Sequence, residues 1–130
     1  MTDSLNLPAY AQALGIALHE IEDGLPILTV DFGADVEGRP GHYHGGAIAG
    51  LLENAAYAAL RSALVAQDRE AKLKPVNITV QYLSAGKPLT SFAKARITRM
   101  GRRNANISVE AWQSDRDKPI ASAVMNILMA

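Results

Sequence analysis

Alternation of apolar and polar residues marks the second half of the chain. Three segments, residues 76–82, 93–98 and 104–111, alternate with a period of two, and residues 120–129 are apolar at nearly every position. A period of two predicts strands with one buried face, and an apolar run without alternation predicts a central strand. Short turn sequences separate these segments, so we expect the final four strands to be joined by short antiparallel connections.

The first half of the chain carries the signals of a short helix and a hairpin. Residues 1–14 predict a short helix, because a proline stands near its start and Gly15 follows its last turn. Residues 16–18 and 25–32 favour strands, and the Asp-Gly pair at 23–24 is a strong hairpin signal between them.

Residues 46–66 predict a long helix that is covered on most sides. The segment is rich in alanine and leucine, contains no proline and is apolar almost all round. It could be mistaken for a membrane span, but it holds Glu53 and Arg61. A charged side chain at the middle of a bilayer costs roughly 3 kcal/mol. We therefore expect a buried helix in a soluble domain and no membrane partner.

These elements leave few ways to build a core. One long apolar helix and about six strands pack best when a strongly curved antiparallel sheet encloses the helix, which is an α+β arrangement. With 130 residues, 48% of them apolar, the chain suffices for one core, and we expect residues 1–130 to form a single domain. The exposed edges of such a sheet favour dimerisation.

Composition and charge exclude several classes of function. Thirteen basic and thirteen acidic residues cancel, so no global charge attracts nucleic acid or an anionic membrane. Cysteine is absent, which excludes disulfides, a thiolate metal site and a cysteine nucleophile. The three histidines give no convincing metal site, and we expect no cofactor. Residues 1–7 lack a secretory signal, so a cytoplasmic location is the default expectation.

Glu53 is the candidate catalytic residue. Its helical neighbours at three and four places are Gly50, Ala49, Ala56 and Tyr57, none of which is basic. An unpaired acid on an apolar helix is expensive to bury and is rarely kept for stability alone. The residues alone leave two interpretations open. Glu53 is either a functional carboxylate, or a residue on an exposed stripe or paired with a distant arginine.

The sequence His44-Gly45-Gly46 stands where the loop of residues 33–43 becomes the long helix. Two glycines let a ligand approach the backbone, and the free N–H groups of a first helical turn lie at the positive end of the dipole. Such a site suits a carbonyl oxygen that becomes an oxyanion. The motif is weak by itself, since turns into helices often need glycine, and we interpret His44 as a residue that ties down the loop.

The spacing of these residues predicts a site shared by two subunits. Glu53 lies nine residues after His44, which in a helix is a rise of roughly 13 Å and a rotation of about half a turn beyond two full turns. The start of the helix and Glu53 therefore cannot easily hold the same reacting bond within one subunit. If both act together, the protein is an obligate dimer with two shared sites.

In combination these features resemble the hotdog-fold thioesterases, specifically the phenylacetate-pathway (PaaI-type) branch related to 4-hydroxybenzoyl-CoA thioesterase. The resemblance covers essentially the whole chain. It implies a long central helix wrapped by a curved antiparallel sheet of about six strands. It rests on Gly41-x-x-His44-Gly45-Gly46-Ala47, on the acid nine places after the histidine, on the strand of residues 76–83 and on the turn Gly101-Arg102-Arg103.

The resemblance further implies a CoA thioester as substrate and a site at the dimer interface. The backbone N–H of Gly45 would polarise the thioester carbonyl, Gly46 would line the substrate site, and His44 would support the loop. Glu53 of the opposite subunit would act as general base towards water or as nucleophile, since members of the family differ. Dimers, and dimers of dimers, are the expected assemblies.

The chain departs from the family's pattern at two places. Relatives usually carry Asn or Gln six residues before the motif histidine, where this chain has Gly38, or Arg39 if one residue is deleted. Many relatives place Ser or Thr early in the strand after the helix, where Pro75 stands and Asn77 is the closest polar substitute. These departures leave the orientation of substrate and water open.

A cluster of cations suggests where the phosphates of CoA bind. Five basic residues, at 94, 96, 99, 102 and 103, surround one predicted hairpin. Arg102 and Arg103 at its turn suit a phosphate clamp, whereas Lys94 and Arg96 fit a solvated strand face equally well. No aromatic platform accompanies the cluster, so nucleic acid is not the expected partner.

Three functions remain open from the sequence. The first is hydrolysis of aryl or of short or medium acyl-CoA thioesters. The second is a hotdog protein that binds acyl-CoA without turnover, which the missing Asn or Gln favours. The third is a hotdog dehydratase, in which His44 would face an acid across the dimer, but the spacing of Glu53 fits the hydrolases better.

Overall fold

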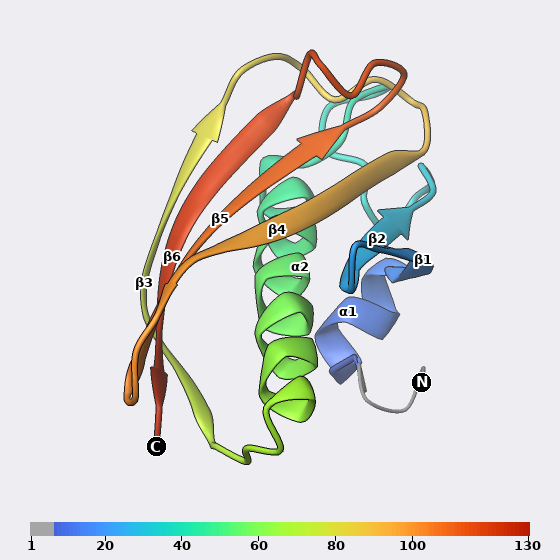
Figure 1. Ribbon diagram of the computed structural model, residues 1–130. Coiled ribbons are helices and arrows are strands. Elements are labelled where there is room, and N and C mark those ends of the chain that lie inside the picture. Colours follow the sequence, from blue (N-terminus) through green and yellow to red (C-terminus); the bar gives the residue numbers. More distant parts are fainter. Residues whose placement is uncertain (1–6) are drawn as a thin grey trace.

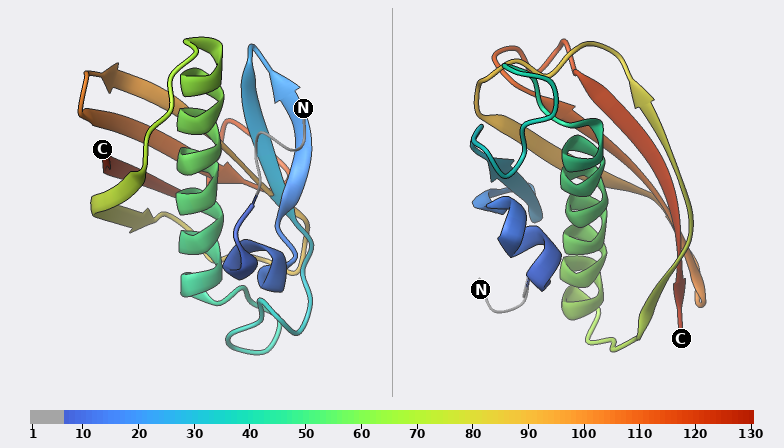
Figure 2. Two further views of the ribbon diagram at one scale, coloured as in Figure 1. Left: turned by 90° about the horizontal axis from the view of Figure 1, so that it is seen from below. Right: turned by 180° about the vertical axis from the view of Figure 1, so that it is seen from behind.

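The computed structural model describes residues 7–130, which form a long helix, a short helix and a six-stranded sheet (Figure 1). The sheet bends around the long helix, with β1 and β2 on one side of it and β3 and β6 on the other (Figure 2). In chain order the elements are α1 (Ala9–Leu14), β1 (Ala17–Glu22), β2 (Leu25–Val30), α2 (Gly45–Ala66), β3 (Leu73–Tyr82), β4 (Ser91–Met100), β5 (Asn104–Trp112) and β6 (Ala121–Met129).

The local turn chemistry agrees with the sequence prediction. Asp23 and Gly24 both have positive φ, of 53° and 79°, and join β1 to β2 through a two-residue turn. Gly15 ends α1 in the left-handed conformation, with φ of 82°. Of the short helix predicted over residues 1–14, residues 1–6 lie outside the described part of the chain.

The strand order is β1-β2-β4-β5-β6-β3, and every neighbouring pair is antiparallel. The predicted short connections are confirmed for β4, β5 and β6. They are wrong for β3, which pairs with β6 at the edge of the sheet, so residues 83–90 must cross to β4. Period-two alternation reports which face of a strand is buried and carries no information about which strand lies beside it.

Alanine on both sides lets α2 lie close to the sheet. The buried residues of β4, β5 and β6 that face the helix include many alanines, and so does the helix itself, while leucine, isoleucine and methionine fill the remaining space. The predicted all-round burial of the helix is therefore confirmed over most of its surface. The most deeply buried large side chains are Leu28, Leu51, Leu52, Leu60, Ile107, Met125 and Ile127.

The short helix α1 covers a further part of α2. Gly50 allows this approach, because a Cβ atom there would lie 3.0 Å from the ring of Tyr10 and 3.1 Å from Leu14. The one buried amide of the helix, Asn54, donates a hydrogen bond of 2.8 Å to the carbonyl of Gly50. Within residues 7–130, no helix has the length and apolar character needed to cross a membrane.

Candidate active site

The start of α2 leaves one backbone donor free. His44 is the N-cap residue, and its Nδ1 accepts a hydrogen bond of 2.8 Å from the N–H of Gly46. Its carbonyl accepts from the N–H groups of Ala47 and Ile48, at 3.0 and 3.2 Å. The N–H of Gly45 has no hydrogen-bond partner among residues 7–130. It is therefore the donor of the first turn that remains available to a ligand oxygen.

The hydrogen bond from Gly46 also selects one tautomer of the neutral His44 ring. An imidazole nitrogen that accepts carries no proton, so in the neutral ring the proton is on Nε2. His44 is thereby engaged in holding the helix start. This geometry fits the predicted supporting role for His44 and leaves Nδ1 unable to act as a general base.

The loop before α2 is held by its own backbone. The N–H of His44 donates to the carbonyl of Val36 at 2.7 Å, and that of Gly38 donates to the carbonyl of His42 at 2.9 Å. A Cβ atom on Gly38 would lie only 2.9 Å from Cα of His44. Glycine at this departure from the family pattern is thus required by the close passage of two backbone segments. A larger residue would move His44 and, with it, the start of the helix.

Tyr82, which the sequence analysis did not single out, covers the other side of the motif. Its hydroxyl donates a hydrogen bond of 2.9 Å to the carbonyl of Gly45, and a Cβ on Gly45 would lie 3.4 Å from its ring. Tyr82 stands at the end of β3, 37 residues away from Gly45 in sequence. Only the pairing of the folded elements could have identified it.

A small cavity of about 250 Å³ opens beside this motif. It contains Gly45 and Arg39, so the structure brings these two residues to one cavity, and substrate binding by Arg39 stays a prediction. The rest of the wall is mainly apolar, which suits an acyl chain or ring. The lining residues are Arg39, His42, Tyr43, Gly45, Ile48, Tyr82, Leu83, Ser84, Ala85, Gly86 and Ile120.

Glu53 lies on the part of α2 that the sheet leaves uncovered. Its side chain is half-buried and has no hydrogen bond or ion pair within residues 7–130, so no arginine of this part of the chain pairs with it, whereas its position on an exposed stripe of the helix stays an open interpretation. One turn further, burial and the nearby Glu53 carboxylate raise the pKa of Tyr57. The guanidinium of Arg61 lies over the Tyr57 ring, 5.4 Å from its centroid.

Within one chain, Glu53 and Gly45 are held apart. The helix α2 runs without interruption from Gly45 to Ala66, against a prediction of residues 46–66. Eight residues of helix separate Gly45 from Glu53 by about 12 Å along the axis. The two groups cannot contact the same thioester from one subunit.

The remaining predicted site residues lie elsewhere. Asn77 is on the outer face of the sheet, where its Oδ1 accepts a hydrogen bond of 2.9 Å from Asn126, so its side chain does not face α2. Lys94 is paired with Glu22 at 2.8 Å. Arg102 and Arg103 are exposed at the turn between β4 and β5.

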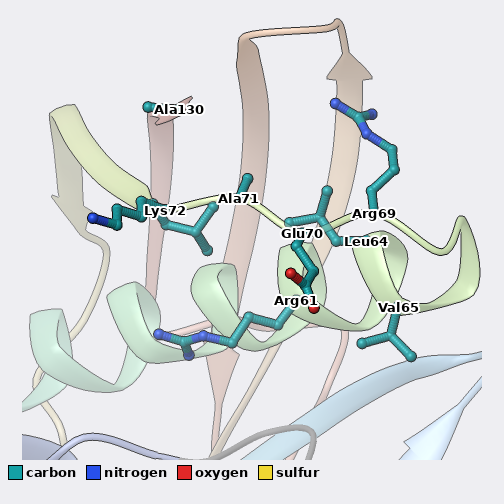
Figure 3. Close-up of a pocket in the computed structure, with 9 residues that line it drawn as sticks. Arg61, Leu64, Val65, Arg69, Glu70, Ala71, Lys72 and Ala130 are labelled. Atoms are coloured by element: carbon teal, nitrogen blue, oxygen red, sulfur yellow. The ribbon is translucent and has the colours of Figure 1, made fainter.

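A second, larger cavity of about 680 Å³ lies at the opposite end of α2 (Figure 3). It contains neither Gly45 nor Glu53, and three of its residues, Arg61, Arg69 and Lys72, are basic. The sequence analysis missed this group because its members are spread over the end of a helix and the following linker. A run of cations in sequence, such as that of the β4–β5 hairpin, is easier to notice.

Comparisons with known proteins identify the family. The family model described as acyl-CoA thioesterase N-terminal domain matches residues 35–128. No curated protein matches the chain significantly. A solved structure from Chromobacterium violaceum is 33% identical, with a TM-score of 0.75, over 97% of this chain and 86% of that one.

Two PaaI structures share the fold at lower identity. The PaaI protein of the Escherichia coli phenylacetic acid degradation operon is 23% identical, with a TM-score of 0.75, over 92% of this chain and 87% of its own. A mutant of the phenylacetic acid degradation protein PaaI from Thermus thermophilus is 19% identical, with a TM-score of 0.78, over 95% and 100% of the two chains. With the long helix and the six-stranded antiparallel sheet, these matches show that the chain belongs to the acyl-CoA thioesterase family and has the hotdog fold.

Proposed function

We propose that the protein hydrolyses acyl-CoA thioesters to the free acid and CoA. The observation that carries the proposal is the free N–H of Gly45, because His44 fixes the neighbouring donors and leaves this one to bind an oxyanion. The Glu53 carboxylate, which has no ion-pair partner among residues 7–130, is available for the second role. Membership of the family supports the reaction type, and the site residues are our assignment.

The reaction requires a nucleophile and a place for negative charge. In the general-base route Glu53 takes a proton from water, and the oxygen of that water adds to the thioester carbonyl carbon. The carbonyl electrons move to its oxygen, which accepts a hydrogen bond from Gly45. When the carbonyl reforms, the carbon–sulfur bond breaks and the CoA thiolate leaves to be protonated. In the alternative route the Glu53 carboxylate attacks the carbonyl carbon, the carbon–sulfur bond breaks and the CoA thiolate leaves. Water then hydrolyses the mixed anhydride to the free acid and regenerates Glu53.

Two subunits would complete each site. Because about 12 Å of helix separates Gly45 from Glu53, we assign the two groups of one site to different chains. The edge strand β3 offers a surface for self-association, since Val76 and Tyr82 there are 58% and 56% exposed. The positive end of the partner's helix dipole would favour the carboxylate form of Glu53. Assembly of such dimers in pairs is a further expectation from the family.

The substrate is expected to be an aryl or a short or medium acyl-CoA. The mainly apolar wall of the 250 Å³ cavity suits such a group. Structural similarity to PaaI proteins of phenylacetic acid degradation makes aryl thioesters the first candidates. Arg39 at the cavity would contact the bound substrate, and Arg102 and Arg103 remain candidates for the CoA phosphates.

Release of free thiol from a panel of aryl- and acyl-CoAs tests the function. We expect Glu53→Gln to lower turnover at least about a hundredfold, the usual effect of removing a general base. Because Glu53 accepts no hydrogen bond in residues 7–130, the variant should melt within about 2 °C of the wild type. Glu110→Gln, which removes an exposed acid from β5, is the matched control and should remain active. Near wild-type turnover by Glu53→Gln would remove Glu53 from the mechanism.

The same experiment separates hydrolysis from binding without turnover. Gly38 favours this second function, because relatives usually have a polar amide at that position to orient substrate or water. A wild-type protein that binds acyl-CoA but releases no thiol from any member of the panel would establish the binding function instead.

A further inference from the structure

The cavity of about 680 Å³ at the end of α2 has a consistent chemical character. It lies between the last turns of the helix and the start of β3. Three of its side chains are basic, and only Glu70 is acidic (Figure 3). No ion pair joins Glu70 to any of these cations within residues 7–130. The residues that line it are Arg61, Leu64, Val65, Arg69, Glu70, Ala71, Lys72, Leu73 and Ala130.

Arg61 supplies the most specific feature of the cavity. Its Nη1 is fully covered and has no hydrogen-bond partner among residues 7–130. The guanidinium is partly withdrawn from water, and this burial lowers the pKa of Arg61. A covered guanidinium nitrogen without an acceptor is uncommon, since buried polar groups are nearly always paired. The Tyr57 ring lies against this guanidinium, with its centroid 5.4 Å from Cζ, so an anionic ligand provides the missing acceptor only when the Arg61 side chain turns into the cavity that it lines.

The other two cations differ in how they are held. Arg69 is occupied, because its Nη2 donates 3.0 Å to the carbonyl of Arg102 and its Nη1 donates 3.2 Å to Oε1 of Gln67. It therefore fixes the β4–β5 turn beside the cavity. Lys72 is exposed, and in Figure 3 its side chain extends in the same direction as that of Arg61. Arg61 and Lys72 are thus the pair available to a ligand.

We propose that this cavity binds a phosphate group of the CoA thioester, with Arg61 and Lys72 as its ligands. Arginine forms paired hydrogen bonds to phosphate oxygens, and lysine adds a point charge. Arg61 is eight residues from Glu53, so the cavity lies about two helical turns away along the same stripe of α2. A CoA thioester carries its phosphates far from its thioester, and a cationic site displaced from the carboxylate matches that shape.

Competing cations are less suitable for this role. Lys94 and Arg116 share Glu22, at 2.8 and 2.7 Å, and Lys94 also lies 3.8 Å from Asp23, so two acids balance these two cations. Arg102 and Arg103 are exposed at a turn and do not line this cavity. The bond from Arg69 to the Arg102 carbonyl brings that turn to the same end of the molecule. We therefore place the phosphate between the C-terminal end of α2 and Lys72, with the β4–β5 turn at the edge of this site.

The inference rests on the proposed function, and direct binding tests it separately. Calorimetry would compare CoA, dephospho-CoA and pantetheine on the wild type, Arg61→Gln, Lys72→Gln and the double variant. Lys118→Gln, at an exposed position in the β5–β6 loop, is the charge-matched control. We expect each single variant to weaken CoA binding about tenfold and the double variant more, while pantetheine binding and the control stay unchanged.

The possible results separate the two proposals. The phosphate site would be overturned if Lys72→Gln and Arg61→Gln bound CoA with wild-type affinity. It would also be overturned if the variants lost affinity for CoA and for pantetheine to the same extent. If Arg61→Gln fails to fold by circular dichroism, exposed Lys72 still decides the matter, because its replacement removes no buried contact. Selective loss of CoA binding in a protein that hydrolyses no thioester would support the phosphate site and reject the hydrolase. Thioester hydrolysis with unchanged CoA affinity in every variant would support the hydrolase and reject the phosphate site.

Discussion

The cap at the start of α2 can be tested by removing one hydrogen bond. His44→Ala deletes the Nδ1 acceptor, 2.8 Å from the N–H of Gly46, and His44→Asn replaces it with a side chain that caps helices well. His42→Ala is the control for stability alone, because this nearby ring lies outside the helix and contacts the carbonyl of Pro40 through Nδ1, at 3.1 Å, but also lines the 250 Å³ cavity. All three changes preserve the length of the loop and the glycines of the motif.

The expected magnitude follows from the exposed position of the bond. An N-cap replaced by alanine costs about 1 kcal/mol of the free energy of unfolding. Unfolding entropy of about 2.1 cal/mol/K per residue then converts this loss, for a chain of 130 residues, into a fall in Tm of about 4 °C. His44→Asn should recover most of the loss. His42→Ala should stay within about 2 °C of the wild type, as surface substitutions usually do.

The activity of these variants tests the role of the cap in orienting Gly45. Once the N–H of Gly46 is free, the first turn can rotate, and we expect His44→Ala to lose about tenfold in kcat/KM for thioester hydrolysis. This loss is smaller than the ~100- to 1000-fold effect of deleting an oxyanion donor altogether. Thermal melts at one fixed protein concentration and thiol-release kinetics give both numbers. If His44→Asn is as unstable and as slow as His44→Ala, capping is not the function of His44.

Two further results are expected. Mixing inactive Glu53→Ala chains with chains that carry a bulky residue at Gly45 should restore up to half the activity per dimer. In each heterodimer one site then contains both substitutions and the other contains neither. Confirmed subunit exchange without recovered activity would refute the shared site. Hydrogen bonds from Arg116 and Lys94 lower the pKa of Glu22 from 4.5 to about 2, so this carboxylate stabilises the fold above pH 4.5 and the contribution is lost as the pH falls towards 2. In urea melts, Glu22→Gln should therefore have a lower free energy of unfolding than the wild type at neutral pH, and this free energy should fall less between pH 4.5 and 2. If the free energies of both proteins fell in parallel with pH, Glu22 would not be the group responsible.

Much of the fold could be predicted from the sequence because it depends on local patterns of residues. The Asp-Gly pair at 23–24 needs positive φ at both residues, and that alone determines the hairpin. The long helix was predicted within one residue of its start at Gly45. In contrast, the place of β3 at the sheet edge was missed. Its alternation predicts one buried face and does not indicate whether strands lie on both sides of it, and Val76, expected on that face, is 58% exposed at the register shift between Pro75 and Asn77.

The candidate site likewise combines features that the local sequence indicates with features that depend on contacts between distant segments. Glu53 and the His44 motif stand out in sequence because their chemistry contrasts with an apolar helix and with a helix interior. The contact of Gly38 with the His44 backbone and the bond of Tyr82 to Gly45 join distant segments, and no sequence pattern announces them. Arg61 looked like an ordinary helix cation. Only the folded chain reveals that one of its nitrogens is covered and has no acceptor in the described residues 7–130.

The geometry of α2 also restricts how two subunits can meet. If Gly45 of one chain lies opposite Glu53 of the other and the reverse holds as well, the two helices are antiparallel and their twofold axis passes near the midpoint, Ala49. Ala49 is half-buried and small, which would allow two helices to approach closely. Ala49→Trp should therefore disrupt the dimer, measured by sedimentation, and abolish hydrolysis while each chain stays folded by circular dichroism. A dimeric, active Ala49→Trp protein would place the twofold axis elsewhere and refute this close antiparallel arrangement of the two helices.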